Sequence, residues 1–320
     1  MSKNEVIGES VMNSSMILPP ALKPGDTIAI IAPAGPIASR AIFDRGISVL
    51  EDMGFRVRFD ARIFQSSRYL AGSDAARADE LIHALENTDI RAVMALRGGY
   101  GCARLIPFLR GSRLLETPKI FMGFSDLTVL HLFFNKRFGW ATFHGPMAAT
   151  DTLAEMPEDQ RRHLFSLWTD TEYRPQFEFP QVEVWSPGGA EGVLTGGCLS
   201  LITAGIGTPY EIETKGKILF LEDCSEAPYR IDRMITHLRL AGKLDKVAGL
   251  LLGQFQDCEP AQGGYTVADV LKETLAELNI PILANFPAGH TRDNWTLPLG
   301  VRARLDTDTR SVRFLDAAVR

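Results

Sequence analysis

A serine stands where an apolar run passes into a helical pattern. The run Lys119–Phe124 (KIFMGF) predicts a buried strand, and apolar side chains recur at helical spacing after Ser125. A serine at such a turn is exposed at the sheet edge, where free N–H groups and the positive end of the helix dipole suit a developing oxyanion. Ser125 is therefore a candidate nucleophile. The competing interpretation is that it only caps the helix, as serines often do, and Leu127 stands where the G-x-S-x-G motif has its second glycine.

A glycine-rich segment, Arg97–Gly101 (RGGYG), follows another predicted buried strand. Three glycines in four positions allow positive φ angles and let the backbone approach a ligand closely. The functional interpretation is a cradle for an anion or oxyanion that faces Ser125 across adjacent strand ends. A phosphate-binding turn for a nucleotide and a plain tight turn are the alternatives, although the segment lacks the full G-x-G-x-x-G pattern and an obvious ribose-binding acid.

An acid and a histidine also lie at predicted strand ends. Glu222 ends the apolar run KILFLED and could orient a histidine as the acid of a catalytic triad, or be a solvated charge. Of the six histidines, His290 is the best placed, on a loop after the predicted strand 282–286. His144, which precedes a Gly-Pro pair after a strand, is the rival base, whereas His131 lies in a helical pattern typical of a packed residue. No histidine pair has metal-ligand spacing, so we predict no catalytic metal.

The elements that must position these residues alternate strand and helix through the first half of the chain. Strand-type runs at 26–33, 90–96 and 120–124 are separated by helix-length segments, which predicts βαβ units and a mostly parallel sheet. In such sheets ligand groups gather at the carboxyl ends of the strands. The second half restarts after a proline-interrupted stretch and ends, at 295–315, in short strands with turns.

We therefore predict an α/β fold with an N-terminal, mostly parallel sheet flanked by helices and a smaller β-rich C-terminal domain. At roughly 100–200 residues per domain, a chain of 320 residues favours two domains. The expected divisions are a flexible leader at 1–20, an N-terminal α/β domain at 21–165 carrying the nucleophile, a linker at 166–190, and a C-terminal β-rich domain at 191–320 carrying the glutamate and the histidine.

Charge and composition narrow the function classes. The net charge of -5, from 34 basic and 39 acidic residues, and the dispersed basic side chains argue against a nucleic-acid partner. No apolar run is long enough to span a bilayer, and residues 1–18 lack the pattern of a secretory signal, so we expect a cytoplasmic protein with no membrane partner. The four cysteines show no CxxC pair and are interpreted as reduced, scattered thiols.

Seven stretches of the sequence resemble the LD-carboxypeptidase family of serine peptidases, the muramoyltetrapeptide carboxypeptidases. The resemblance runs from about Leu22 to the C-terminus and leaves only the leader outside. Any one stretch is unspecific, but seven in family order are very hard to explain otherwise. They are LKPGDTIAIIAPAGP at 22–36, LRGGYG at 96–101, GFSDLTVLH at 123–131, HGPM at 144–147, LTGGCLSLI at 194–202, LFLEDCSEAPYRIDRM at 219–234 and ANFPAGH at 284–290.

The resemblance implies a role for the catalytic positions. Ser125 is the nucleophile, His290 the general base and Glu222 the third member of the triad, divided between the two domains. Backbone N–H groups, expected at Gly99 and Asp126, form the oxyanion hole. No catalytic position departs from the family pattern, and the family implies a homodimer.

A carboxypeptidase also needs a cation for the terminal carboxylate of its substrate. We expect Arg230, which follows Glu222 closely in the sequence, to supply it. Tyr100 and His144 are further candidates for substrate binding. We expect no cofactor.

The resemblance implies a serine carboxypeptidase that hydrolyses the L,D-peptide bond of a muramoyl tetrapeptide and releases the terminal D-alanine in peptidoglycan recycling. The expected partner is thus a murein-derived peptide. One alternative is a hydrolase of the same family that cleaves a peptidyl-nucleotide antibiotic and confers immunity, with the same triad and a different leaving group. The other is a non-catalytic two-domain protein whose RGGYG segment binds an anionic ligand.

Overall fold

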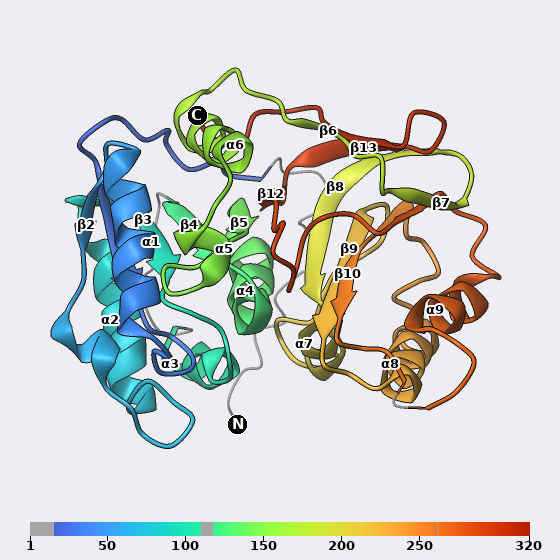
Figure 1. The fold of residues 1–320 in the computed structure, drawn as a ribbon, viewed down its shortest axis with the longest axis horizontal. Coiled ribbons are helices and arrows are strands. Elements are labelled where there is room, and N and C mark those ends of the chain that lie inside the picture. The colour runs from blue at the N-terminus through green and yellow to red at the C-terminus, as the bar shows by residue number, and fades with distance from the viewer. Residues whose placement is uncertain (1–15, 110–117, 261) are drawn as a thin grey trace, which may run out of the picture.

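The structure, a computed structural model, describes residues 16–109, 118–260 and 262–320. Its strands form two sheets that lie side by side, each packed with helices (Figure 1). The first sheet is built almost entirely from the first half of the chain, drawn blue to green, and the second from the half drawn yellow to red. The predicted α/β fold class is confirmed.

The first sheet is mostly parallel. Among the described residues it has six strands in the order β12-β5-β4-β3-β1-β2, and only β12 runs antiparallel to its neighbour. The strands are β1 (Thr27–Ile31), β2 (Arg56–Arg58), β3 (Ile90–Ala95), β4 (Ile120–Gly123), β5 (Thr142–His144) and β12 (Leu297–Leu299). The helices of this half are α1 (Arg40–Asp52), α2 (Asp74–Glu86), α3 (Ile106–Leu109), α4 (Thr128–Phe138), α5 (Asp151–Ala154) and α6 (Glu158–Thr169), with short 3₁₀ turns η1 (Ala61–Phe64), η2 (Cys102–Leu105) and η3 (Ser125–Leu127).

The second sheet has a parallel centre and antiparallel edges. As far as the chain is described, its eight strands follow the order β6-β14-β13-β8-β9-β10-β11-β7, with β8 to β11 parallel to one another. The strands are β6 (Gln176–Glu178), β7 (Glu183–Ser186), β8 (Gly189–Cys198), β9 (Ile218–Cys224), β10 (Gly249–Gln256), β11 (Ile282–Ala284), β13 (Arg302–Asp306) and β14 (Ser311–Phe314). The helices are α7 (Leu199–Ala204), α8 (Pro228–Leu240) and α9 (Val267–Leu275).

Local sequence explains the central elements. Strand β9 (ILFLEDC) lies between two parallel neighbours and is buried from Ile218 to Asp223, as the apolar run predicts. Helix α9 begins with a capping box, in which Thr266 and Asp269 bond each other's backbone N–H groups. Helix α4 ends at Gly139, whose φ of 67° lies in the left-handed region that glycine adopts without strain.

The two sheets share one apolar core. Met122 of β4 and Phe143 of β5 belong to the same buried cluster as Phe220 of β9 and Leu251 of β10. At the boundary the His144 ring of β5 lies 5.0 Å from the Phe220 ring. The carboxyl ends of β4, β5 and β9 therefore come together where the two halves meet.

Two segments differ from the predicted divisions. The stretch 166–190, predicted to be a linker, contains β6 and β7, the two edge strands of the second sheet. Prolines are tolerated at sheet edges and strand ends, so Pro175 and Pro187 mark the ends of these strands. Strand β12 lies within the predicted C-terminal domain in sequence but pairs with β5 of the first sheet.

Most of the predicted leader, 1–15, lies outside the described residues. Residues 16–20 contact the body of the protein. Ile17 forms a β-bridge with Trp140, and the backbone N–H of Arg320 donates to the carbonyl of Pro19 at 3.0 Å. The last residues of the predicted leader are thus ordered against both halves of the chain.

Candidate active site

Ser125 lies at a strained strand-to-helix turn. Strand β4 ends at Gly123, and Ser125 opens η3, which leads directly into α4. Its φ of 63° places a non-glycine residue in the left-handed region, where a backbone costs about 1–3 kcal/mol relative to ordinary conformations. Such strain persists only where the surroundings hold it, and it is typical of functional positions.

The RGGYG segment packs directly on this serine. A Cβ atom added to Gly98 would lie 2.8 Å from Ser125 Cβ and 2.9 Å from its Oγ, so only glycine fits there. Gly99 follows with a φ of 113°, and the Gly35 N–H donates to the Gly98 carbonyl at 3.1 Å, which fixes the loop. Within the described chain the backbone N–H groups of Gly99 and Asp126 donate to no protein acceptor.

The Asp126 side chain ties this loop to η3. It is buried, and its Oδ2 accepts the backbone N–H of Cys102 at 2.8 Å. Burial raises the pKa of the Asp126 carboxyl, although the Cys102 and Gly101 backbone donors oppose the shift. The residue predicted for the oxyanion hole through its backbone therefore also holds the glycine loop through its side chain.

Glu222 and His290 form a hydrogen-bonded pair on the other half of the chain. Glu222 lies near the end of β9 and is fully buried, and its Oε2 accepts His290 Nδ1–H at 2.7 Å and the His290 backbone N–H at 3.2 Å. A Cβ at Gly289, whose φ is 110°, would lie 2.5 Å from the same carboxylate oxygen. Glycine before the histidine is thus required for the pair to form.

The electrostatics of this pair are strongly coupled. Burial alone would lower the pKa of His290, but its interactions with Cys224 and Glu222 outweigh burial and raise that pKa to about 10. Burial would raise the pKa of Glu222, but His144 and His290 lower it to about 2. The carboxylate is therefore held ionised beside the imidazole.

The serine and the histidine come from different halves of the chain, which meet here at the residue before the serine. The Phe124 ring, one residue before Ser125, meets the His290 ring edge-on at a centroid distance of 4.9 Å. No hydrogen bond joins Ser125 Oγ to His290 in the described part of the chain. Such catalytic bonds often shorten only when substrate is bound.

His144 lies behind the acid. It is fully buried, its Nε2 is 3.7 Å from Glu222 Oε1, and neither ring nitrogen has a hydrogen-bond partner among the described residues. It therefore faces Glu222, although the sequence suggested that it would contact substrate. His131, expected to be packed, is fully buried, and its Nε2 bonds the Gly123 carbonyl at 2.8 Å.

Arg230 lies on α8 and is half exposed. It pairs with Glu226 at 3.4 Å and lies beside Tyr229. The structure thus gives the residue predicted for the substrate carboxylate an acidic partner of its own.

A pocket opens beside the glycine loop. Its volume is about 620 Å³, and it is lined by Gly35, Pro36, Tyr69, Arg97, Gly99 and Tyr100. Tyr100 was predicted for substrate binding, whereas Tyr69 and Arg97 were not singled out. Arg97 opens the RGGYG segment, so its place in the motif was the available signal. Cys224 was also missed, and only its contact with His290 reveals it.

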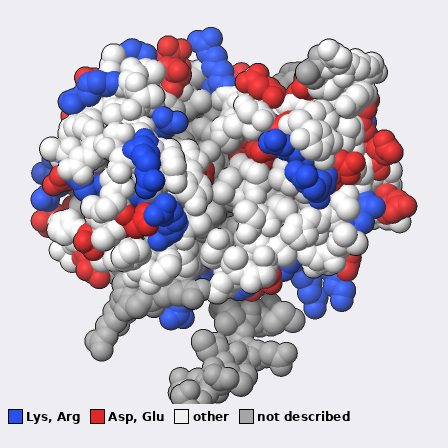
Figure 2. All heavy atoms as spheres, turned by 90° about the horizontal axis from the view of Figure 1, so that it is seen from below, with Lys and Arg blue, Asp and Glu red and all other residues white. Residues whose placement is uncertain are grey.

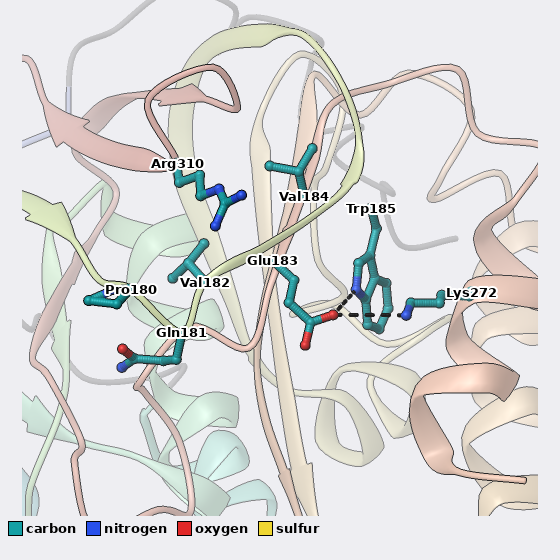
Figure 3. A pocket seen from close by; sticks show the side chains of 8 residues that line it. All are labelled: Pro180, Gln181, Val182, Glu183, Val184, Trp185, Lys272 and Arg310. Carbon is teal, nitrogen blue, oxygen red and sulfur yellow. Dashed lines mark hydrogen bonds and ion pairs between the residues drawn. The ribbon is translucent and has the colours of Figure 1, made fainter.

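A second hollow lies at the edge strand β7 (Figure 3). Its volume is about 410 Å³, and Glu183, Trp185 and Lys272 lie together on its wall. Glu183 accepts the Trp185 indole N–H at 2.9 Å and lies 3.8 Å from the Lys272 ammonium, which sits over the indole ring. These polar groups satisfy one another, and no residue of the Ser125 region lines this hollow.

Charges of both signs are interspersed on the face seen in Figure 2, and no field of one sign covers it. Within the described ranges, no helix is long and apolar enough to cross a membrane. In the same part of the chain no three His, Cys, Asp or Glu side chains are grouped as metal ligands would be.

The fold is a two-domain α/β architecture with a candidate hydrolytic site where the two halves meet. The N-terminal domain of the LD-carboxypeptidases matches residues 28–145, and the C-terminal domain of the same family matches residues 191–305. These matches cover more than half of the chain, so the protein belongs to the LD-carboxypeptidase family. The resemblance seen in the sequence is confirmed.

Its relatives include proteins named as carboxypeptidases and proteins named for self-immunity to microcin C7. The "Probable murein peptide carboxypeptidase" of Bacillus subtilis (strain 168) is 36% identical over 90% of this chain and 91% of its own length. The solved muramoyltetrapeptide carboxypeptidase from Oxalobacter formigenes is 33% identical, with a TM-score of 0.79 over 90% of this chain and 97% of that one. The microcin C7 self-immunity protein MccF of Escherichia coli is 28% identical over 96% of this chain and 98% of its own. An MccF structure with glutamyl sulfamoyl guanosine has a TM-score of 0.88 at 26% identity, over 95% of this chain and 100% of that one.

Proposed function

We propose that this protein is a serine LD-carboxypeptidase that hydrolyses the L,D-peptide bond of a muramoyl tetrapeptide and releases its terminal D-alanine. The observation that carries the proposal is the Glu222–His290 pair, 2.7 Å apart, beside a serine held in the left-handed region. Relatives named as murein peptide and muramoyltetrapeptide carboxypeptidases supply the substrate class.

The arrangement supports a definite sequence of proton transfers. Because Nδ1–H of His290 donates to Glu222, the neutral imidazole presents Nε2 as an acceptor for the Ser125 hydroxyl proton. Ser125 Oγ then attacks the scissile carbonyl carbon, and the imidazolium returns the proton to the leaving amine as the C–N bond breaks. Water, deprotonated by His290, hydrolyses the acyl-enzyme and regenerates the serine.

The oxyanion of each tetrahedral intermediate would accept the backbone N–H groups of Gly99 and Asp126. Both donors lack protein acceptors in the described chain, and both adjoin Ser125 through the contact at Gly98 and the peptide bond. Preorganised donors of this kind supply about 3–4 kcal/mol each to the transition state.

The second candidate is hydrolysis of a peptidyl-nucleotide antibiotic. The TM-score of 0.88 to MccF, solved with glutamyl sulfamoyl guanosine, favours it. The higher identity to the murein carboxypeptidases favours the first candidate. Peptidoglycan recycling, a cytoplasmic location and a homodimer stay predictions from the sequence.

The test is to incubate the pure protein with muramoyl tetrapeptide and measure D-alanine by mass spectrometry, with Ser125→Ala as the matched variant. Release by the wild type alone would support both the reaction and the nucleophile. Equal release by both proteins would rule out Ser125. If the wild type released nothing but cleaved a peptidyl-nucleotide, the second candidate would replace the first.

A further inference from the structure

The pocket beside the nucleophile holds a cation without an acidic partner. Arg97 lines the pocket, and its Nη1 donates to the Pro36 carbonyl at 3.1 Å. Across the described ranges no carboxylate lies within 4.0 Å of its guanidinium. Other arginines of the same domain have acidic partners, among them Arg62 with Glu80 and both Arg77 and Arg104 with Asp74. A guanidinium has five donors, so most of those on Arg97 remain available.

The position of Arg97 relative to the serine suits one part of a carboxypeptidase substrate. Gly98, the next residue, touches Ser125, and Gly99 both lines the pocket and carries a proposed oxyanion donor. Consecutive Cα atoms are about 3.8 Å apart. The Arg97 backbone is therefore close to the glycine that contacts Ser125 and to the glycine that carries the proposed oxyanion donor. The terminal carboxylate of a peptide lies only one residue beyond the scissile carbonyl.

The pocket wall also carries two aromatic side chains. The rings of Tyr69 and Tyr100 lie 5.8 Å apart, and both side chains are about half exposed. The two rings form an apolar wall beside one cation, the Arg97 guanidinium. Such a pocket favours a single small substrate residue that carries a negative charge. Arg230, by contrast, is bound to Glu226 and does not line this pocket.

We propose that Arg97 binds the terminal carboxylate of the substrate, so that the pocket between Arg97, Tyr69 and Tyr100 receives the D-amino acid that leaves. This assignment rests on the proposed function, because it takes Ser125 as the attacking group. A planar guanidinium matches a carboxylate with two parallel N–H···O bonds. An arginine at this position would thus select chain ends over internal peptide bonds.

The test compares two ligands, the muramoyl tetrapeptide with a free terminal carboxylate and the same peptide with a terminal carboxamide. Calorimetry measures the Kd of each ligand for the Ser125→Ala protein, which does not depend on turnover. We expect the free acid to bind on the order of 100-fold more tightly, the value for one charge-assisted pair. Adding Arg97→Gln should bring the two Kd values together, and Arg97→Lys should restore part of the difference.

Arg230→Gln is the matched comparison, since the sequence suggested that residue for the same role. Its Kd ratio should equal that of Ser125→Ala alone. The proposal is overturned if Arg97→Gln leaves the ratio unchanged, if it weakens both ligands equally, or if Arg230→Gln removes the preference. Failure of the proposed function would be a separate result. In that case the wild type would release no D-alanine from the free acid, although the free acid still bound more tightly than the carboxamide and this difference still depended on Arg97.

Discussion

At the scale of single residues, the contact between Gly98 and Ser125 has the most direct consequence for activity. A methyl group on Gly98 would overlap Ser125 Cβ and Oγ, so either the nucleophile or the loop must move. Displacement of a reacting group by about 1 Å can cost on the order of 100-fold in rate. We therefore expect Gly98→Ala to lower kcat/KM for D-alanine release by that factor or more.

The control is Gly264→Ala, because a Cβ at Gly264 meets nothing within 4 Å. Both variants are assayed for release and for thermal unfolding. Retention of activity within about threefold by a folded Gly98→Ala protein would show that the loop does not set the position of the serine.

The second prediction at this scale concerns His290, the proposed base. Cys224 and Glu222 raise the pKa of His290 to about 10 against the effect of burial. A base must be neutral to accept a proton, so kcat/KM should still rise with pH above 6.5, the ordinary value for histidine. This rise of kcat/KM with pH is the acid limb of the pH–rate profile. Removing the thiol in Cys224→Ala should shift the acid limb to lower pH.

A pH–rate profile of the two proteins measures the shift, with Cys258→Ala as a control, since Cys258 is buried near Cys224 but is not a partner of His290. An acid limb at or below pH 6.5 in the wild type, or one that Cys224→Ala does not move, would contradict this account.

At the scale of elements, β5 and β9 approach each other through His144 and Glu222. Both side chains are fully buried, and their facing atoms, Nε2 and Oε1, are 3.7 Å apart. His144 is one of the two groups that lower the pKa of Glu222. We therefore expect His144 to act on the reaction through Glu222, the proposed acid of the other half.

We expect His144→Phe to lower kcat by about tenfold while KM changes less than threefold, because a group that acts through Glu222 affects the transition state and not ground-state binding. Steady-state kinetics with the tetrapeptide measure the two constants separately. A raised KM with unchanged kcat would instead support the substrate-binding role that the sequence suggested.

The elements also show what the sequence could and could not predict. The sequence singled out Ser125, Glu222 and His290 because each follows an apolar run, and the carboxyl ends of parallel strands converge. Apolar periodicity cannot tell which sheet a short strand joins, so the return of β12 to the first sheet was not foreseen. The partners of Arg97, Cys224 and His144 depend on contacts between distant segments, which no local pattern specifies.

At the scale of the whole molecule, histidines buried in a neutral form tie stability to pH. His163 of α6 bonds Tyr173 OH at 3.1 Å and the Thr296 carbonyl at 2.8 Å, and so links α6 to the segment before β12. Burial lowers the pKa of His163 to about 4 and that of His131 to about 3, although a backbone acceptor opposes the shift in each case. In the unfolded chain both should titrate near the ordinary value of 6.5.

The sign follows from proton binding. Between pH 6.5 and 4 the unfolded chain binds protons that the folded protein excludes, so the free energy of unfolding must fall as the pH falls. His163 alone should account for a loss of about 3 kcal/mol between pH 7 and pH 4. Glu222, whose folded pKa is lowered to about 2, adds its own loss only below pH 4.5.

Urea unfolding at pH 7, 6, 5 and 4 measures this slope in the wild type, in His163→Gln and in a control, His237→Gln, whose histidine is exposed on α8. Glutamine cannot be protonated, so His163→Gln should be less stable at pH 7 but should lose about 3 kcal/mol less than the wild type on acidification. The control should follow the wild type. If His163→Gln and the wild type gave parallel curves down to pH 4, the contact between α6 and the chain before β12 would not be the origin of acid sensitivity, and His131 would be the next group to replace.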